Sequence, residues 1–155
     1  MRKRVLQHVD RPEAAGEWLD IEPLAEVEVS SEAANAPIEQ ALLASAGSGW
    51  TAAEPGLQSI RLLFEEPQRL QRIWLRFLES AQERTQEFVL RWSPDRGQSS
   101  QEIVRQRWNF SPGGATQENE DYRVDLRGVT VLELMINPDV SGATAIASLA
   151  AMRLA

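Results

Sequence analysis

From residue 58 onward, apolar and polar side chains alternate with a period of two. Ile60, Leu62 and Phe64 alternate with Arg61, Leu63 and Glu65. The same spacing recurs in five later segments, at residues 73–78, 88–92, 103–110, 122–126 and 131–136. Successive side chains of a strand point to opposite faces, so this alternation is typical of a strand with one buried face. The pattern predicts a strand in each segment.

The residues before this point are organised differently. Short apolar positions within 24–29 are interrupted by acidic residues, which favours one or two short strands ending near Val29. Pro37 is a residue tolerated in a first helical turn, and Ile38, Ala41 and Leu42 then recur at the spacing of one helical face. We therefore expect one short helix that ends before Gly47.

Turn-forming sequences separate the predicted strands. They are "EEPQ", "SPDRGQ", "SPGG", "LRG" and "NPDVSG", and residues 149–155 supply a last short strand. Many strands at this spacing predict an all-β fold, an antiparallel β-sandwich or jelly roll of about eight strands with one short helix. At 155 residues the chain suits one domain. We assign residues 1–15 to an N-terminal arm and 16–155 to the domain.

The longer connections are expected at one end of the sandwich. Successive antiparallel strands run in opposite directions, so their connections alternate between the two ends. Counting from the strand ending at Val29, one end receives four long connections, at residues 30–58, 79–86, 110–121 and 137–147. We call this the loop end. The connection at 93–101 is the exception, since it belongs to the opposite end. Long loops are disproportionately functional, so we expect the loop end to bind the ligand.

Composition excludes several classes of site and partner. The chain has no cysteine, so disulfides, thiolate metal sites and cysteine nucleophiles are excluded. The net charge is −7 and the sixteen Lys and Arg residues are scattered, which argues against a nucleic-acid partner. No signal peptide is readable, and no segment approaches the roughly 18–20 apolar residues of a membrane-spanning helix. We expect a cytoplasmic location.

Catalytic candidates are few. His8 is the only histidine and lies in the arm, away from any motif that would pair it with a nucleophile. The acidic residues Glu65–Glu66, before Pro67 at a turn, and those of "ENED" (118–121), in a loop, are expected to be solvated surface. Sequence neighbours on a strand point to opposite faces, so they do not form the facing carboxyl pair that glycoside hydrolysis needs. No phosphate loop or dinucleotide fingerprint occurs. We therefore predict no enzyme activity, no metal site and no cofactor.

Aromatic residues divide into core and candidate ligand positions. Five fall on the apolar faces and are expected in the core: Phe64, Phe77, Phe88, Trp92 and Tyr122. Trp74 falls on the opposite face from Ile73, so it either packs under the N-terminal segment or lines an interface. Trp108 is expected in the core, while Phe110 could reach the loop end.

Six segments follow one another in a distinctive order: "VEVSSE", "PIEQAL", "GW", "LQSIRLLFEEPQRLQRIWLRF", "EFVLRWSPD" and "ASLAAMRLA". This order resembles discoidin-type (coagulation-factor type C) domains of the galactose-binding-like jelly-roll class, of the bacterial carbohydrate-binding type, over residues 17–155. The resemblance implies an eight-stranded sandwich whose loops bind sugars, lipids or other proteins. It also implies a buried tryptophan at Trp50.

Many members of that family hold a structural calcium ion beneath the loop before this tryptophan. In this chain the loop reads "LLASAGSGW", without carboxylate or amide side chains, and the position of the family's last-strand glutamate falls near Ala150 or Ala151. Calcium takes six to eight oxygen ligands, mostly carboxylates. We predict that this chain holds no calcium.

We therefore predict a non-enzymatic binding module that recognises a carbohydrate or related ligand through the loop end. Sugar sites combine an aromatic platform with a few polar groups, and the candidate residues are Trp50, Arg84, Asn109, Phe110, Asn137 and Asp139. Trp50 alternatively ties a long loop to the core, and Arg84 alternatively pairs with a neighbouring acid. The alternative function is a protein–protein interaction or scaffold domain that uses the sheet face around Trp74, Arg76 and Arg91. Neither the ligand nor the oligomeric state follows from the sequence.

Overall fold

The computed structural model describes residues 18–43 and 48–155. The predicted N-terminal arm and the predicted end of the helix at Gly47 lie outside these residues. Two short helices and eight strands follow in chain order: α1 (Ile21–Leu24), β1 (Ala25–Val29), α2 (Glu39–Leu42), β2 (Trp50–Pro55), β3 (Gln58–Leu78), β4 (Arg84–Ser93), β5 (Gln101–Phe110), β6 (Gln117–Asn137), β7 (Ile146–Leu149) and β8 (Ala151–Leu154). The predicted all-β class is confirmed.

Six strands form one antiparallel hydrogen-bonded sheet that folds over on itself. Its order is β1-β3-β6-β4-β5, and β8 also pairs with β3. The first part of β3 lies between β1 and the last part of β6, whereas its second part lies between β8 and the first part of β6. The result is a five-stranded layer containing β4 and β5, and a three-stranded layer containing β8. Phe77 of the small layer stacks on Phe88 of the large layer, with ring centroids 5.3 Å apart.

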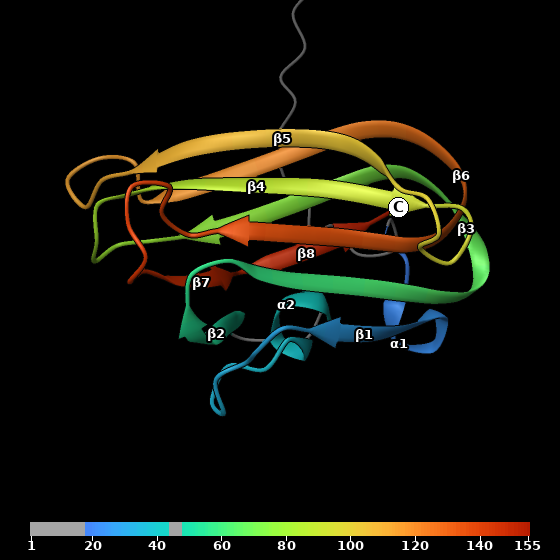
Figure 1. Ribbon diagram of the computed structural model, residues 1–155, viewed down its shortest axis with the longest axis horizontal. Helices are drawn as coiled ribbons and strands as arrows, with labels where there is room; N and C mark the ends of the chain where they lie inside the picture. Colours follow the sequence, from blue (N-terminus) through green and yellow to red (C-terminus); the bar gives the residue numbers. More distant parts are fainter. Residues whose placement is uncertain (1–17, 44–47) are drawn as a thin grey trace, which may run out of the picture.

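Two predicted turns are corners within continuous strands. "EEPQ" (65–68) lies inside β3, and "LRG" (126–128) lies inside β6. The register between these strands shifts three times between Leu63 and Arg72. Pro67 sits in this irregular stretch, as prolines within sheets usually do, and Gly128 has a φ of +76°. In Figure 1 both strands run to the right-hand end, bend there and return to the left.

The predicted buried faces are confirmed. Ile60, Leu62 and Phe64 are at most 1% exposed, as are the alternating apolar residues of the later strands, Ile73, Leu75, Phe77, Phe88, Leu90, Leu132, Leu134 and Ile136. Trp92 and Tyr122 are partly buried and pack against this core. The helix α2 buries Ala41 and Leu42, as its spacing predicts. One core therefore fills the space between the two layers.

Three local predictions are corrected. Leu24, predicted as part of a strand, instead ends the helical turn α1 (21–24), in which Ile21 is buried and Pro23 lies in the first turn, where proline is tolerated. Residues 50–55, predicted as loop, form β2, which pairs with β7 in a second, two-stranded sheet. The single predicted strand at 149–155 is instead divided between β7 and β8.

The long connections gather at one end, as predicted. The loop after β3 meets the loop before β6 where the Glu79 N–H donates to the Thr116 carbonyl at 2.8 Å. The loop after β6 meets β4 where the Val140 N–H donates to the Thr85 carbonyl at 2.8 Å. In Figure 1 these loops lie together on the left, while the 94–100 loop lies at the opposite end with the two corners. No helix in the described part of the chain is long and apolar enough to cross a membrane.

Candidate functional site

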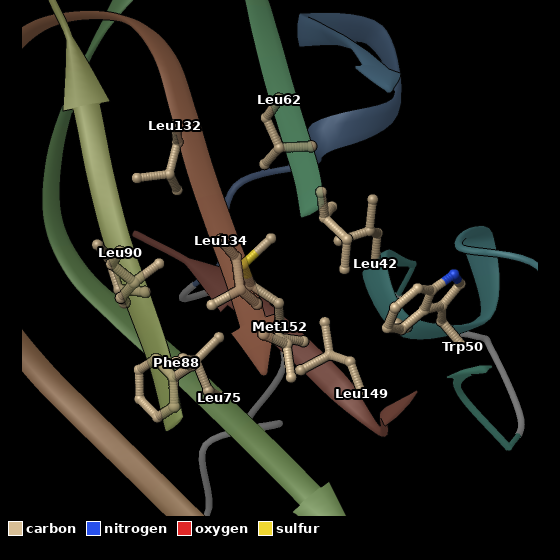
Figure 2. Close-up of a cluster of buried hydrophobic side chains, with 14 of the residues drawn as sticks. Leu42, Trp50, Leu62, Leu75, Phe88, Leu90, Leu132, Leu134, Leu149 and Met152 are labelled. Atoms are coloured by element: carbon tan, nitrogen blue, oxygen red, sulfur yellow. The ribbon is translucent and has the colours of Figure 1, made fainter. Parts of the chain in front are cut away.

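Trp50 holds the first part of the loop end against the core. Its side chain is 1% exposed, and its indole Nε1–H donates to the Ser31 carbonyl at 3.0 Å. Figure 2 shows the ring beside Leu42 and Leu149, with the indole nitrogen turned away from the apolar cluster. Gly49 approaches β7 so closely that an added Cβ would lie 2.5 Å from the Leu149 carbonyl oxygen. The interpretation of Trp50 as an anchor is therefore confirmed.

Arg84 connects three parts of the loop end from inside the sandwich. Its guanidinium pairs with Glu79 at 2.7 Å, and it donates to the Pro138 carbonyl at 2.8 Å and to Gln86 Oε1 at 3.2 Å. The guanidinium also lies over the Phe110 ring, 4.7 Å from its centroid. The predicted ion pair of Arg84 with a neighbouring acid is therefore confirmed. Arg84 is only 3% exposed, so its charge is buried. A buried charge needs such partners because its desolvation is costly.

The pKa of Glu79 reflects this arrangement. Partial burial acts to raise the pKa, but hydrogen bonds from Arg84 and from the Ala81 and Gln82 N–H groups outweigh it and lower the pKa below the ordinary value. Glu79 therefore stays charged opposite Arg84 at neutral pH. Through Glu79, the start of the loop after β3 is hydrogen-bonded both to the middle of the loop and to Arg84 at its end.

No aromatic side chain is exposed at the loop end. All ten aromatic residues of the chain lie in the described part, and each is buried or half-buried. Phe110 is fully buried beneath Arg84 and does not reach the surface. Trp108 is half-buried against the core, as predicted. An exposed aromatic platform is therefore absent from these residues.

The surface above Arg84 is instead polar. We call five residues the loop-end polar cluster: Thr85, Asn109, Asn137, Asp139 and Ser141. The Thr85 hydroxyl donates to Asn109 Oδ1 at 2.7 Å, and the Asp139 N–H donates to Asn137 Oδ1 at 3.3 Å. Asp139 Oδ1 accepts from both the N–H and the hydroxyl of Ser141, at 3.1 and 3.0 Å.

The cluster joins residues that are distant in sequence. Strand pairing places Thr85 opposite Asn109 and places Glu87 opposite Asn137, so the predicted residues from β4, β5 and β6 are neighbours. The pKa of Asp139 is lowered, first by the Ser141 backbone hydrogen bond, so this group is an anionic acceptor. The structure brings together four of the six predicted site residues around Arg84 and buries Trp50 elsewhere. Thr85 and Ser141 were missed, because a hydroxyl residue carries no distinctive sequence signal, whether it lies in a strand, as Thr85 does, or in a turn, as Ser141 does.

Beneath the cluster lies a buried carboxyl group that sequence interpretation placed at the surface. Glu118 is fully buried on β6, where its Oε1 accepts from Gln86 Nε2 at 3.2 Å and its Oε2 has no partner. Burial, followed by the nearby charge of Glu120, raises the pKa of Glu118 to about 8. The signal was its parity, since Glu118 shares the inward face of β6 with Tyr122 and Val124. The "ENED" segment belongs to a strand, which corrects its prediction as a solvated loop.

The residues where the resembling family holds calcium do not suit that ion. Gly49 packs against Leu149 and Ala150, and neither Ala150 nor Ala151 offers a ligand side chain. Arg153 of β8 is buried, and its guanidinium donates to the carbonyls of Ala41 at 2.8 Å and Leu43 at 3.3 Å. The Arg153 guanidinium is thus a fixed cation that already hydrogen-bonds the carbonyl groups of Ala41 and Leu43, just before the loop. No group of three or more acidic or histidine side chains within 18–43 and 48–155 could hold a metal ion.

The sheet face proposed for the alternative function is divided. Trp74 and Arg76 lie on the outer surface of the small layer, whereas Arg91 lies on the outer surface of the large layer. Trp74 is 3% exposed and stacks on Trp18, with ring centroids 6.4 Å apart. It therefore packs under the N-terminal segment, one of the two predicted alternatives. The prediction that these three residues share a face is wrong, because β3 bends into the other layer before Trp74.

The fold is similar to that of several solved carbohydrate-binding modules. A family 32 module of a family 31 glycoside hydrolase from Clostridium perfringens has a TM-score of 0.63 and 17% identity, covering 88% of this chain and 93% of that one. The family 32 module of AlyQ, in complex with 4,5-unsaturated mannuronic acid, has a TM-score of 0.61 and 15% identity, covering 85% and 95%.

A third similar structure is the family 32 module of C. perfringens NanJ in complex with galactose. Its TM-score is 0.59 and its identity 11%, covering 84% of this chain and 92% of that one. No protein-family model and no curated protein sequence matches the chain. At these identities the likeness concerns the fold: the chain has the discoidin-like, galactose-binding-like jelly-roll fold of the family 32 modules, as its motif order predicts.

Proposed function

We propose that this protein is a carbohydrate-binding module without catalytic activity and that it binds sugar through the loop end. The observation that carries the proposal is the gathering of four long connections over the loop-end polar cluster. The solved modules with the same fold include complexes with galactose and with an unsaturated mannuronic acid, which supports a sugar as the ligand class.

The polar cluster suits sugar hydroxyl groups, which both donate and accept hydrogen bonds. Asn109 is exposed, and beyond its bond to Thr85 its side-chain amide retains two N–H donors. Asp139 supplies anionic oxygen atoms, which form stronger hydrogen bonds than neutral acceptors do. Because no aromatic ring is exposed there, binding would depend on hydrogen bonds whose net gain over water is about 1 kcal/mol each. We expect weak, hydrogen-bond-dominated affinity.

A glycan array with the purified protein tests this proposal. Binding to a sugar on the array should fall about fivefold or more in Asn109→Ala and in Asp139→Ala, since about 1 kcal/mol corresponds to about fivefold in affinity. Asp125→Ala is a matched control, since Asp125 is an exposed acid near the opposite end. Thermal unfolding of each variant separates lost binding from lost folding. Failure of the wild-type protein to bind any glycan, with the fold intact, would contradict the proposal.

A further inference from the structure

A pocket of about 140 Å³ lies at the opposite end of the molecule from the loop-end polar cluster. It is on the outer surface of the large layer, between β3, β6, β4 and the 94–100 loop. Residues that matter to its chemistry are Arg61, Arg91, Glu133, Gly97 and Ser100. We call it the outer-face pocket. One wall of the pocket is the 94–100 loop, the long connection that lies at the opposite end from the proposed sugar-binding loops.

The pocket sits on a row of alternating charges that crosses all five strands. Strand pairing places five side chains successively opposite one another, in the order Glu28, Arg61, Glu133, Arg91 and Glu102. Opposite charges directly across a sheet stabilise strand pairing. The row thus gives the pocket two guanidinium groups with one carboxylate between them.

Arg91 is the member of this row whose guanidinium has no ion-pair partner within the described residues. Glu133 lies 3.6 Å from Arg61, and Glu102 pairs with Arg105 at 3.0 Å. Within residues 18–43 and 48–155, the Arg91 side chain makes no hydrogen bond and no ion pair, although it is half-buried. A guanidinium presents five N–H donors in a planar arrangement that matches a carboxylate. Arg91 is therefore a cationic donor open to a ligand.

Arg61 provides a second donor atom. Its Nε is buried and has no hydrogen-bond acceptor, since the nearest contact is the 3.6 Å approach to Glu133. Its Nη1 reaches Glu28 at 3.3 Å. The Nε is closed to solvent, so the donor that Arg61 offers to a ligand is Nη2, which lies beside the Gly97 wall of the pocket: an added Cβ at Gly97 would be 3.3 Å from it.

The wall of the pocket is fixed by hydrogen bonds. The Arg96 guanidinium donates to the carbonyls of Phe64 and Glu65, and the Arg96 N–H donates to Thr130 Oγ1 at 2.9 Å. Asp95 accepts from Ser99 and Ser93, and these hydrogen bonds hold the pKa of Asp95 at about 2. The loop is therefore formed before a ligand binds, which lowers the entropic cost of binding.

We propose that the outer-face pocket binds a sugar acid, with the guanidinium groups of Arg91 and Arg61 holding its carboxylate. Glu133 lies between these donors and is an acceptor, which suits a ligand that carries hydroxyl groups beside its carboxylate rather than a bare anion. The pocket volume admits a single sugar residue at most, since sites for larger ligands are roughly 300–1,000 Å³. The inference rests on the proposed function only in taking the ligand to be a sugar, and its site is separate.

The test is an NMR titration of the uniformly ¹⁵N-labelled protein with sodium D-galacturonate. We expect saturable shifts of the backbone amides of Arg91, Gly97, Ser100 and Glu133. D-galactose at equal concentration should leave these amides unshifted, and sodium acetate should shift them with at least tenfold weaker affinity. Equal effects of galacturonate and acetate, or no saturable shift at the pocket, would overturn the proposal.

Two variants locate the binding. Arg91→Gln should weaken galacturonate binding at least tenfold, and its amide spectrum should otherwise match the wild type because the Arg91 side chain makes no described hydrogen bond or ion pair. Arg107→Gln is the control, since Arg107 is an exposed arginine on the same surface, paired with Glu87 at 2.7 Å. It should bind as the wild type does, and unchanged binding by Arg91→Gln would overturn the assignment.

The two sites can fail independently in this experiment. Shifts confined to Asn109 and Asp139 would support the loop end and overturn the outer-face pocket. Shifts confined to the pocket would support the pocket and contradict the loop end as the sugar site.

Discussion

The two ends of the sandwich use charged side chains in opposite ways. At the loop end, the charged Arg84 and the largely protonated Glu118 lie between the layers, and the surface above them offers amides, hydroxyls and Asp139. At the opposite end the charges lie outside, where Arg61 and Arg91 line a pocket beneath a fixed loop. Buried charge shapes a surface without contacting the ligand, whereas half-buried charge can contact it. The polar interior at one end is therefore structural, and the charged exterior at the other is available for recognition.

The largest effect is expected from the anchor of the loop end. Trp50→Ala removes a fully buried ring and should destabilise the protein by about 3–5 kcal/mol. Trp50→Phe keeps much of the packing but leaves the Ser31 carbonyl without its donor, so it should cost roughly 1–3 kcal/mol. Denaturant unfolding measures both. If the alanine variant were as stable as the phenylalanine variant, Trp50 would not anchor the loop end.

The buried carboxyl should make stability depend on pH. Glu118 has a pKa of about 8 in the folded protein against 4.5 ordinarily, so unfolding releases a proton between these values. Stability should therefore fall as pH rises from about 4.5 to 8 and then level off. Each pKa unit is worth about 1.4 kcal/mol, so the effect is on the order of 2–4 kcal/mol.

Glu118→Gln should remove this dependence. The glutamine oxygen can still accept from Gln86, and its amide can donate as the protonated acid does. The variant should be more stable than the wild type at pH 8 and nearly equal to it at pH 4.5, as measured by thermal unfolding at both values. An unchanged pH dependence would assign the titration to another group.

A matched pair of glycines separates the two ends. Gly97 has a φ of +91°, and an added Cβ would lie 3.3 Å from Arg61 Nη2. Gly97→Ala should cost roughly 1–2 kcal/mol, because a Cβ is unfavourable in left-handed backbone. Gly113 in the loop before β6 has open space around it, so Gly113→Ala should leave the unfolding midpoint nearly unchanged. Equal costs at the two positions would show that the 94–100 loop is not fixed.

The smallest effect is expected from an exposed ion pair. Arg69 and Asp125 are 3.1 Å apart near the corners, and both side chains are about half exposed. Such pairs contribute about 0–1 kcal/mol, so Arg69→Ala should change stability by less than about 0.5 kcal/mol. Arg84→Ala is the buried counterpart and should cost about 3–5 kcal/mol. Denaturant unfolding of both variants measures the two losses of stability. Equal losses would contradict the burial of Arg84.

The sequence predicted the buried faces well because alternation directly reflects which side of a strand is covered. It failed at the corners, since Pro67 and Gly128 belong to the residue types that also form hairpin turns. It also missed β2, where the pattern is too short to show a period. For the candidate site, the neighbours Asn109, Asn137 and Asp139 followed from the loop arrangement. The buried state of Glu118 did not, because charged residues are almost never fully buried and a surface role was assumed.

The bends in β3 and β6 have a consequence for how the molecule folds. The two strands pair with each other on both sides of their corners, so the same pair of strands forms part of both layers. Neither layer can detach as an independent unit, so the slowest-exchanging amides of both should open together in global unfolding. The pairing also joins segments that are far apart in the chain, which predicts slow folding in a single cooperative transition.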